Sequence, residues 1–139
     1  MGELIGGSGE QMTAEAERFL PGEMEGVIEL EHYHRYIFAG QLASKKTVLD
    51  IASGEGYGSA YLAGIAAKVI GVDISQAAVR HASMKYPREN LEYRLGSCAN
   101  MPVDDGSVDL VVSFETIEHH DEHEAMMSEI RRVLRPGGV

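Results

Sequence analysis

The chain has little of several features that mark particular classes of protein. It has no tryptophan and a single cysteine, Cys98, and no stretch approaches the roughly 18 apolar residues of a membrane-spanning helix. One cysteine cannot form a disulfide within the chain, which favours a reducing compartment. The first twelve residues are glycine-rich and polar, unlike a signal peptide. We therefore expect a cytoplasmic protein that does not enter a membrane.

Basic residues are also scarce. The chain has 12 Lys and Arg against 22 Asp and Glu, a net charge of −10. Binding to nucleic acid relies on neutralising phosphates, so this balance disfavours a nucleic-acid partner. The one basic cluster, Arg131, Arg132 and Arg135, falls at the carboxyl end of a predicted helix, where it complements the helix dipole. With 139 residues and 44% hydrophobic residues, the chain can form one domain with a core.

Apolar strands and helical segments alternate along most of the chain. The predicted strands are Thr47–Ile51, Val69–Asp73, Leu91–Leu95 and Val108–Phe114. The predicted helices are Val27–Ala43, Gly58–Ala67, a segment from its cap Ser75 to Tyr86, and a segment from a capping box of Asp121 and Glu124 to Leu134. This alternation predicts an α/β fold with a doubly wound, Rossmann-like parallel sheet over residues 27–139. We expect residues 1–26 to be a flexible segment.

A glycine-rich turn lies between the first predicted strand and the helix that follows. Residues Thr47–Gly58 read TVLDIASGEGYG, and Asp73 ends the next strand. Glycines let a ligand approach the backbone, and an acid about 20 residues on can accept hydrogen bonds from ribose hydroxyls. The spacing Gly54-x-Gly56-x-Gly58 departs from the dinucleotide pattern G-x-G-x-x-G. The turn alone leaves open a nucleoside cofactor, a dinucleotide, or no ligand.

Four motifs in order decide between these readings. They are VLDIASGEG, VIGVDIS, LGSCANMPVDDGSVDLVVSFETIEHH and EIRRVLRPGGV. From about Thr47 to Val139 the chain resembles the class I S-adenosylmethionine-dependent methyltransferases, in particular their type-11 group. The resemblance implies S-adenosylmethionine as cofactor and the strand order 3-2-1-4.

The resemblance also implies which residues bind the cofactor. Ala52 stands where the family has its first glycine, and Ser97 stands where it often has the Asp that faces the adenine amino group. The cofactor-binding residues that we expect are Asp50, Ala52, Ser53, Gly54, Gly56, Asp73, Ile74, Ser97, Cys98, Ala99, Phe114 and Arg35. Cys98 has no obvious base nearby, so we expect its backbone rather than its thiol to serve the site.

The histidine-rich segment has several readings. Glu118-His119 matches the Glu-His that follows strand four in the family, so His119 is a candidate general base for an oxygen or nitrogen nucleophile, with a structural role as the alternative. His119, His120 and His123 could also suggest a metal site. The acids among them are explained by a helix amino terminus, and we expect no metal.

The family normally has further strands after the fourth, so the chain looks truncated there. We expect Val108, Leu110, Val111, Val112 and Phe114 to present an apolar edge and an open face, which favours a homo-oligomer. The predicted function is methyl transfer to a small-molecule or glycan acceptor. The opening ERFLP…ELEHYHRY is similar to methyltransferases encoded among surface-polysaccharide genes.

Two alternatives remain open. One is a non-catalytic module that binds the cofactor but lacks the substrate half. The other is an NAD-dependent oxidoreductase, which the missing third-position glycine and the lack of a Tyr-x-x-x-Lys pair disfavour.

Overall fold

The computed structural model describes residues 33–114 and 122–139. The chain divides into two compact units, residues 1–38 and 39–139. Residues 33–40 are helical and fall inside the predicted helix Val27–Ala43. The predicted flexible segment, residues 1–26, lies outside the described residues, as do His119 and His120.

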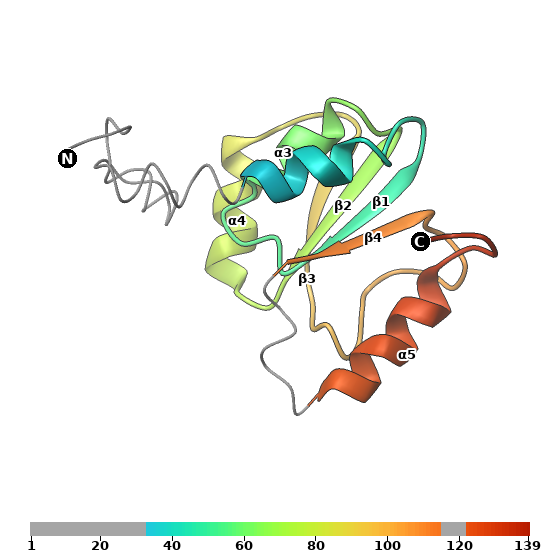
Figure 1. Ribbon diagram of the computed structural model, residues 1–139. Helices are drawn as coiled ribbons and strands as arrows, with labels where there is room; N and C mark the ends of the chain where they lie inside the picture. The colour runs from blue at the N-terminus through green and yellow to red at the C-terminus, as the bar shows by residue number, and fades with distance from the viewer. Residues whose placement is uncertain (1–32, 115–121) are drawn as a thin grey trace, which may run out of the picture. The chain divides into compact units, whose positions relative to one another are not determined.

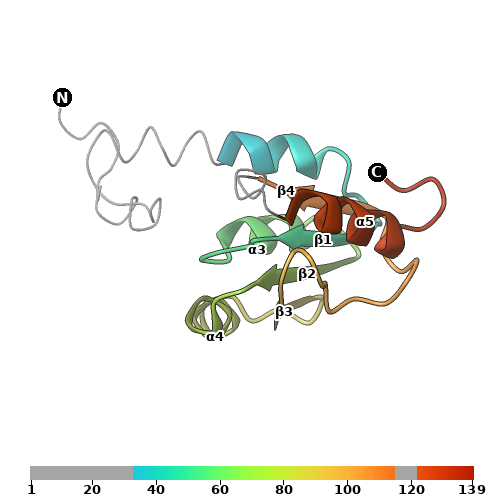
Figure 2. The same ribbon diagram turned by 90° about the horizontal axis from the view of Figure 1, so that it is seen from below.

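Four parallel strands form the sheet, in the order β3-β2-β1-β4. They are β1 (Thr47–Ile51), β2 (Lys68–Asp73), β3 (Leu91–Leu95) and β4 (Leu110–Ser113). Figure 2 shows them in this order from β4 to β3. The predicted fold class and strand order are confirmed, and two of the strands have the predicted bounds. The sheet is parallel because each strand returns through a crossover, and a parallel sheet is buried on both faces.

Three helices cover the two faces of the sheet. They are α3 (Tyr57–Ala63), α4 (Gln76–Lys85) and α5 (His123–Val133) (Figure 1). Alternate strand residues point to opposite faces. On one face, apolar strand residues pack against Met126 and Val133 of α5. These strand residues are Leu49, Ile51, Ile70 and Val72. On the other face the Ser59 hydroxyl of α3 donates to Asp50, and α4 lies against β3.

Several helix ends differ from their predicted positions. Ser75 caps α4 as predicted, because its Oγ accepts the Ala78 N–H at 3.1 Å. Helix α3 ends at Ala63 rather than Ala67, with Gly64 as its cap. Helix α5 begins at His123, and its N-cap Glu122 makes no side-chain cap bond; Asp121 of the predicted capping box lies outside the described residues. Because the Glu122 carboxylate does not cap the helix, it can contact groups on the neighbouring surface.

The predicted open face of β4 is wrong for three of its five residues. Val108, Leu110 and Val112 are buried, whereas Val111 and Phe114 are half-buried. The end of α5 lies against Val108, whose backbone exchanges hydrogen bonds with Val133 and Arg135 at 3.0 and 2.9 Å. These bonds shorten β4, which begins at Leu110 rather than Val108.

The outer edge of β4 has a partner at one point. The Val139 N–H donates to Asp109 O at 3.0 Å, and the Val111 N–H donates to Val139 O at 2.9 Å. This is the bonding pattern of a parallel strand beside Leu110. None of the helices in the described ranges is long and apolar enough to cross a membrane.

Candidate cofactor site

A cavity of about 480 Å³ lies at the carboxyl ends of the strands. In an open parallel sheet, these ends are where ligands bind. Strand ends, the loops that follow them and the start of α5 all contribute to it. Its lining residues are Ile51, Ala52, Val72, Asp73, Ile74, Gly96, Ser97, Cys98, Phe114 and Glu122. The lining is mostly apolar with a few polar groups, as in small-molecule sites generally.

The glycine loop, residues 52–56, joins β1 to α3 with a left-handed backbone at every second residue. Ala52, Gly54 and Gly56 have φ of 67°, 56° and 94°. Glycine adopts this conformation freely, whereas for alanine it costs roughly 1–2 kcal/mol. A Cβ built on Gly54 would meet nothing within 4 Å. The loop therefore leaves open space directly beside its backbone at Gly54.

Asp73 joins this loop to β2. Its Oδ2 accepts the Gly54 N–H at 2.9 Å, and its Oδ1 accepts the Ser75 N–H at 3.0 Å. A carboxylate has about four lone-pair positions, so two remain for a ligand. Asp73 also lines the cavity. This arrangement fits the hydroxyl pair of a ribose, and it ties the ligand position to the shape of the loop.

The loop after β3 forms another wall. Ser97 Oγ accepts the Ala99 N–H at 2.9 Å, which leaves the hydroxyl one donor and one further acceptor position. The Cys98 thiol donates to Glu122 Oε1 at 3.7 Å. Burial, and secondly the Glu122 carboxylate, raise the pKa of the Cys98 thiol. A protonated thiol is a weak nucleophile, so Cys98 contributes shape rather than covalent chemistry.

The sequence matches the family described as a methyltransferase domain over residues 49–139. The chain belongs to this family. It is 41% identical over 130 residues to a protein of Mycolicibacterium smegmatis named as a probable S-adenosylmethionine-dependent methyltransferase, covering 88% of this chain and 48% of that protein. It is 32% identical over 108 residues to the phthiotriol/phenolphthiotriol dimycocerosates methyltransferase of Mycobacterium tuberculosis, covering 76% and 40% of the two chains.

A solved structure is similar as well. The S-adenosylmethionine-dependent methyltransferase from Aquifex aeolicus superposes with a TM-score of 0.65 and 25% identity, over 74% of this chain and 58% of that one. The chain spans less than half the length of the two curated relatives named above.

The cavity brings together six of the residues predicted to bind the cofactor: Ala52, Asp73, Ile74, Ser97, Cys98 and Phe114. Their direct contact with the cofactor stays a prediction. Gly54 presents the open backbone described above. Arg35 belongs to the other compact unit and His119 lies outside the described residues, so their roles also stay predictions.

Other predicted residues shape the methyltransferase domain from beneath the loop. Asp50 is fully buried and accepts the Ser59 hydroxyl at 2.7 Å. Ser53 is buried too, and Gly56 is the N-cap of α3. None of these three, nor Ala99, is among the lining residues of the cavity. Where they stand, they set the conformation of the loops whose surfaces line it.

Four lining residues were not predicted: Ile51, Val72, Gly96 and Glu122. Ile51, Val72 and Gly96 lie at or just after the carboxyl ends of predicted strands, so their position in the pattern could have identified them. Glu122 had no such signal, because α5 reaches the cavity only through the tertiary fold. Within the described ranges, no three His, Cys, Asp or Glu side chains are placed to hold a metal ion.

Proposed function

We propose that this methyltransferase domain binds S-adenosylmethionine and transfers its methyl group to a small-molecule or glycan acceptor. The main support is the position of the Asp73 carboxylate. It lines the cavity and accepts the Gly54 N–H, and the space next to Gly54 is open. A ribose held by Asp73 would place the rest of the nucleoside along the apolar wall of Ile74 and the loop after β3. Family membership and the names of the relatives support the same cofactor.

The glycine loop also speaks against a dinucleotide. The N–H groups of Ala52 and Ser53 donate to Val72 O, and the Gly56 N–H donates to Ser53 O. The Gly54 N–H donates to Asp73. A pyrophosphate needs free amides at such a turn, and these four are engaged inside the protein. A nucleoside without phosphate needs none of them, which favours S-adenosylmethionine over NAD.

The chemistry asks little of the side chains. S-adenosylmethionine would supply an activated methyl group on a sulfonium. The acceptor atom would attack the methyl carbon in line, the C–S bond would break, and S-adenosylhomocysteine would leave as a neutral thioether. The protein holds the two partners in register and limits water at the reacting face. Asp73 orients the ribose, Ser97 offers hydrogen bonds to the base, and Ile51, Val72 and Phe114 provide apolar lining. We propose His119 as the base for an acceptor that must lose a proton.

The acceptor class rests on charge and on likeness. The net charge of −10 opposes a polyanionic acceptor such as nucleic acid, which agrees with a small-molecule or glycan acceptor. One curated relative is named for methylation of phthiotriol and phenolphthiotriol dimycocerosates. The lone Cys98 adds a cytoplasmic setting to the proposal, because the chain has no second cysteine for a disulfide.

Two measurements test this function. In calorimetric titrations, S-adenosylmethionine and S-adenosylhomocysteine should both bind, and NAD should not. Binding of NAD alone would favour the oxidoreductase. Transfer of a labelled methyl group to extracted small molecules or glycans would then establish catalysis. Binding without transfer to any fraction would favour a non-catalytic cofactor-binding module.

We also propose self-association through β4. Its outer edge pairs with Val139 beside Leu110, and the edge of a sheet is a surface on which a second chain can add a strand. The burial of Val108, Leu110 and Val112 reduces the apolar area that association could cover. Light scattering at tens of micromolar should show a dimer or higher oligomer, and a stable monomer would refute this part of the proposal.

A further inference from the structure

Tyr93 of β3 reaches across the neighbouring strand to the glycine loop. It pairs with Gly71 of β2, and a Cβ built on Gly71 would lie 2.8 Å from Tyr93 Cδ1. The ring therefore occupies the space above Gly71 that any larger residue would fill. From there the Tyr93 hydroxyl donates to Gly56 O at 2.7 Å. A glycine in the middle of a strand often marks such a close approach.

The carbonyl that Tyr93 holds is the point where the loop becomes a helix. Gly56 O also accepts the Ala60 N–H at 3.0 Å, the first hydrogen bond of α3. Gly56 has a φ of 94°, and a Cβ there would come within 2.9 Å of Tyr93 Oη and 2.6 Å of Ala82 Cβ. The Tyr93 hydroxyl thus fits only if residue 56 is glycine, and it binds the carbonyl at which α3 starts.

Three consecutive loop residues are held by three different elements. Asp73 of β2 accepts the Gly54 N–H at 2.9 Å. His81 of α4 lies 3.1 Å from the Glu55 carboxylate, and the two side chains are 48% and 42% exposed. Tyr93 of β3 holds Gly56 from the more buried side. A hydrogen bond away from water is less easily replaced than an exposed pair, so Tyr93 should contribute more than His81.

We infer that Tyr93 is a positioning residue for cofactor binding: through Gly56 O it fixes the left-handed glycine loop in the shape that receives the nucleoside. This rests on the proposed function, and it concerns a residue that does not itself line the cavity. Without the hydroxyl, the loop spends part of its time in other conformations. The apparent affinity for the cofactor then falls in proportion to the fraction of molecules whose loop has the binding conformation.

The protonation state of Tyr93 suits this role. Burial, and secondly the Asp50 carboxylate, raise the pKa of Tyr93 above its usual range. A carbonyl oxygen can only accept a hydrogen bond, so a protonated hydroxyl is required. The tether therefore persists throughout the neutral pH range.

The structure offers a matched control at the other end of the same helix. The Asn90 side-chain amide donates to Ala63 O at 2.8 Å and to Ala66 O at 3.2 Å, beyond the glycine loop. Tyr93→Phe removes one tether at the start of α3, and Asn90→Ala removes tethers at its end. Both variants should lower the melting temperature. The two variants differ in where the hydrogen bond is lost: next to the glycine loop in Tyr93→Phe and away from it in Asn90→Ala.

The experiment measures S-adenosylhomocysteine affinity and melting temperature for the wild type and both variants. Tyr93→Phe should raise Kd about three- to tenfold, the effect of losing one hydrogen bond, while Asn90→Ala should leave Kd unchanged. An unchanged Kd in Tyr93→Phe, or an equal rise in both variants, would overturn the inference. Failure of the wild type to bind would instead overturn the proposed function.

A second variant protects the test against poor folding of the first. Gly71→Ala keeps the hydroxyl but places a methyl group 2.8 Å from both Tyr93 Cδ1 and Ser59 Oγ and 3.1 Å from Ser53 Oγ, so the ring and the two serine side chains must shift. Its Kd for S-adenosylhomocysteine should also rise. Wild-type affinity in Gly71→Ala would contradict the role of Tyr93, whatever happens to Tyr93→Phe.

Discussion

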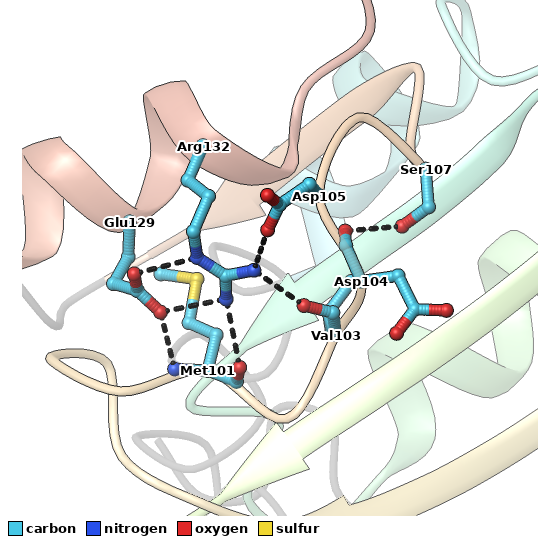
Figure 3. A network of polar contacts seen from close by, with 7 residues as sticks. All are labelled: Met101, Val103, Asp104, Asp105, Ser107, Glu129 and Arg132. Carbon is cyan, nitrogen blue, oxygen red and sulfur yellow. Dashed lines mark hydrogen bonds and ion pairs between the residues drawn. The ribbon is translucent and has the colours of Figure 1, made fainter.

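Two loops of the sheet are held in opposite ways. The glycine loop, residues 52–56, has three left-handed residues and touches open space. The second loop, residues 101–107, precedes β4 and is gripped by one side chain of α5, Arg132 (Figure 3). The Arg132 guanidinium donates to Met101 O at 3.0 Å, to Val103 O at 2.9 Å and to Asp105 Oδ1 at 2.6 Å.

Glu129 completes this network. It receives two hydrogen bonds from Arg132, each at 2.8 Å, and it accepts the Met101 N–H at 2.7 Å. The Arg132 hydrogen bond, more than any other cause, lowers the pKa of Glu129 to about 2. In this second loop, Arg132 and Glu129 bind the polar backbone groups and also bind each other. The glycine loop instead tolerates strain and leaves space, which is the pattern expected where a ligand completes the structure.

The largest effect should come from adding a side chain to the open space. Gly54→Val should abolish detectable binding of S-adenosylhomocysteine, because the isopropyl group would occupy the ligand's place. Its left-handed φ would also strain the fold by roughly 1–2 kcal/mol. Calorimetric titration and thermal unfolding would measure the two effects.

The second loop supplies a closely matched control. Gly106 has a φ of 54°, close to the 56° of Gly54, and a Cβ there would also meet nothing within 4 Å. Gly106→Val should therefore lose similar stability and retain binding. Normal affinity in Gly54→Val would mean that the nucleoside does not approach this turn.

Removal of the ribose acid should have the next largest effect. Asp73→Ala should weaken S-adenosylmethionine binding by about 1.5–3 kcal/mol, or roughly 10- to 150-fold, through the loss of charge-assisted hydrogen bonds. Asp109 is the control, because its carboxylate also accepts a backbone N–H, that of Thr47 at 2.9 Å. If folded Asp73→Ala binds as tightly as Asp109→Ala, Asp73 is not the ribose ligand.

The second loop should respond in stability rather than in binding. Arg132→Ala should lower the free energy of unfolding by about 2–3 kcal/mol, because it removes the Arg132 donor from two carboxylates and two carbonyls. The neighbouring Arg131 is exposed, and Arg131→Ala should have little effect. Urea unfolding at pH 7 measures both. If Arg132→Ala lost affinity for S-adenosylmethionine without losing stability, the two loops would not differ in role as described.

The same network gives a pH dependence. Because the pKa of Glu129 is depressed in the folded state, its contribution is complete above its ordinary pKa of 4.5 and is lost as the pH falls toward 2. The stability difference between wild type and Arg132→Ala should therefore shrink as the pH falls from about 5 to about 3, because protonation of Glu129 is then more favourable in the unfolded chain than in the folded wild type. A constant difference over that range would contradict the pairing.

The smallest effect concerns backbone strain. Ala52→Gly should raise the free energy of unfolding by about 0.5–1 kcal/mol, because glycine relieves the left-handed strain but gains entropy in the unfolded chain. Lys45 also has a positive φ, of 62°, outside both loops. Lys45→Gly should give a similar gain. A gain for Lys45→Gly alone would show that the rest of the glycine loop depends on the Ala52 side chain.

Sequence patterns predicted what depends on near neighbours. Thr47–Ile51 and Leu91–Leu95 were predicted as strands with the observed bounds, and Ser75 was predicted as a cap whose partner lies three residues away. The left-handed Ala52 could not be read from an alanine, and the family resemblance alone placed it at the site. The Arg132 grip joins residues about 30 positions apart, and Glu122 enters the cavity from α5. Such features exist only after the sheet has brought distant segments together.

The position of β1 between β2 and β4 has a consequence for the order of folding. β2 follows β1 closely, whereas the bond from Thr47 to Asp109 beside β4 closes a loop of 62 residues. Closing a longer loop costs more chain entropy, and non-local pairings form slowly. We expect β1, β2 and β3 to assemble first and to bring Asp73 and Tyr93 to the glycine loop. Phe114 and Glu122 would then join the cavity with β4 and α5, in the later step.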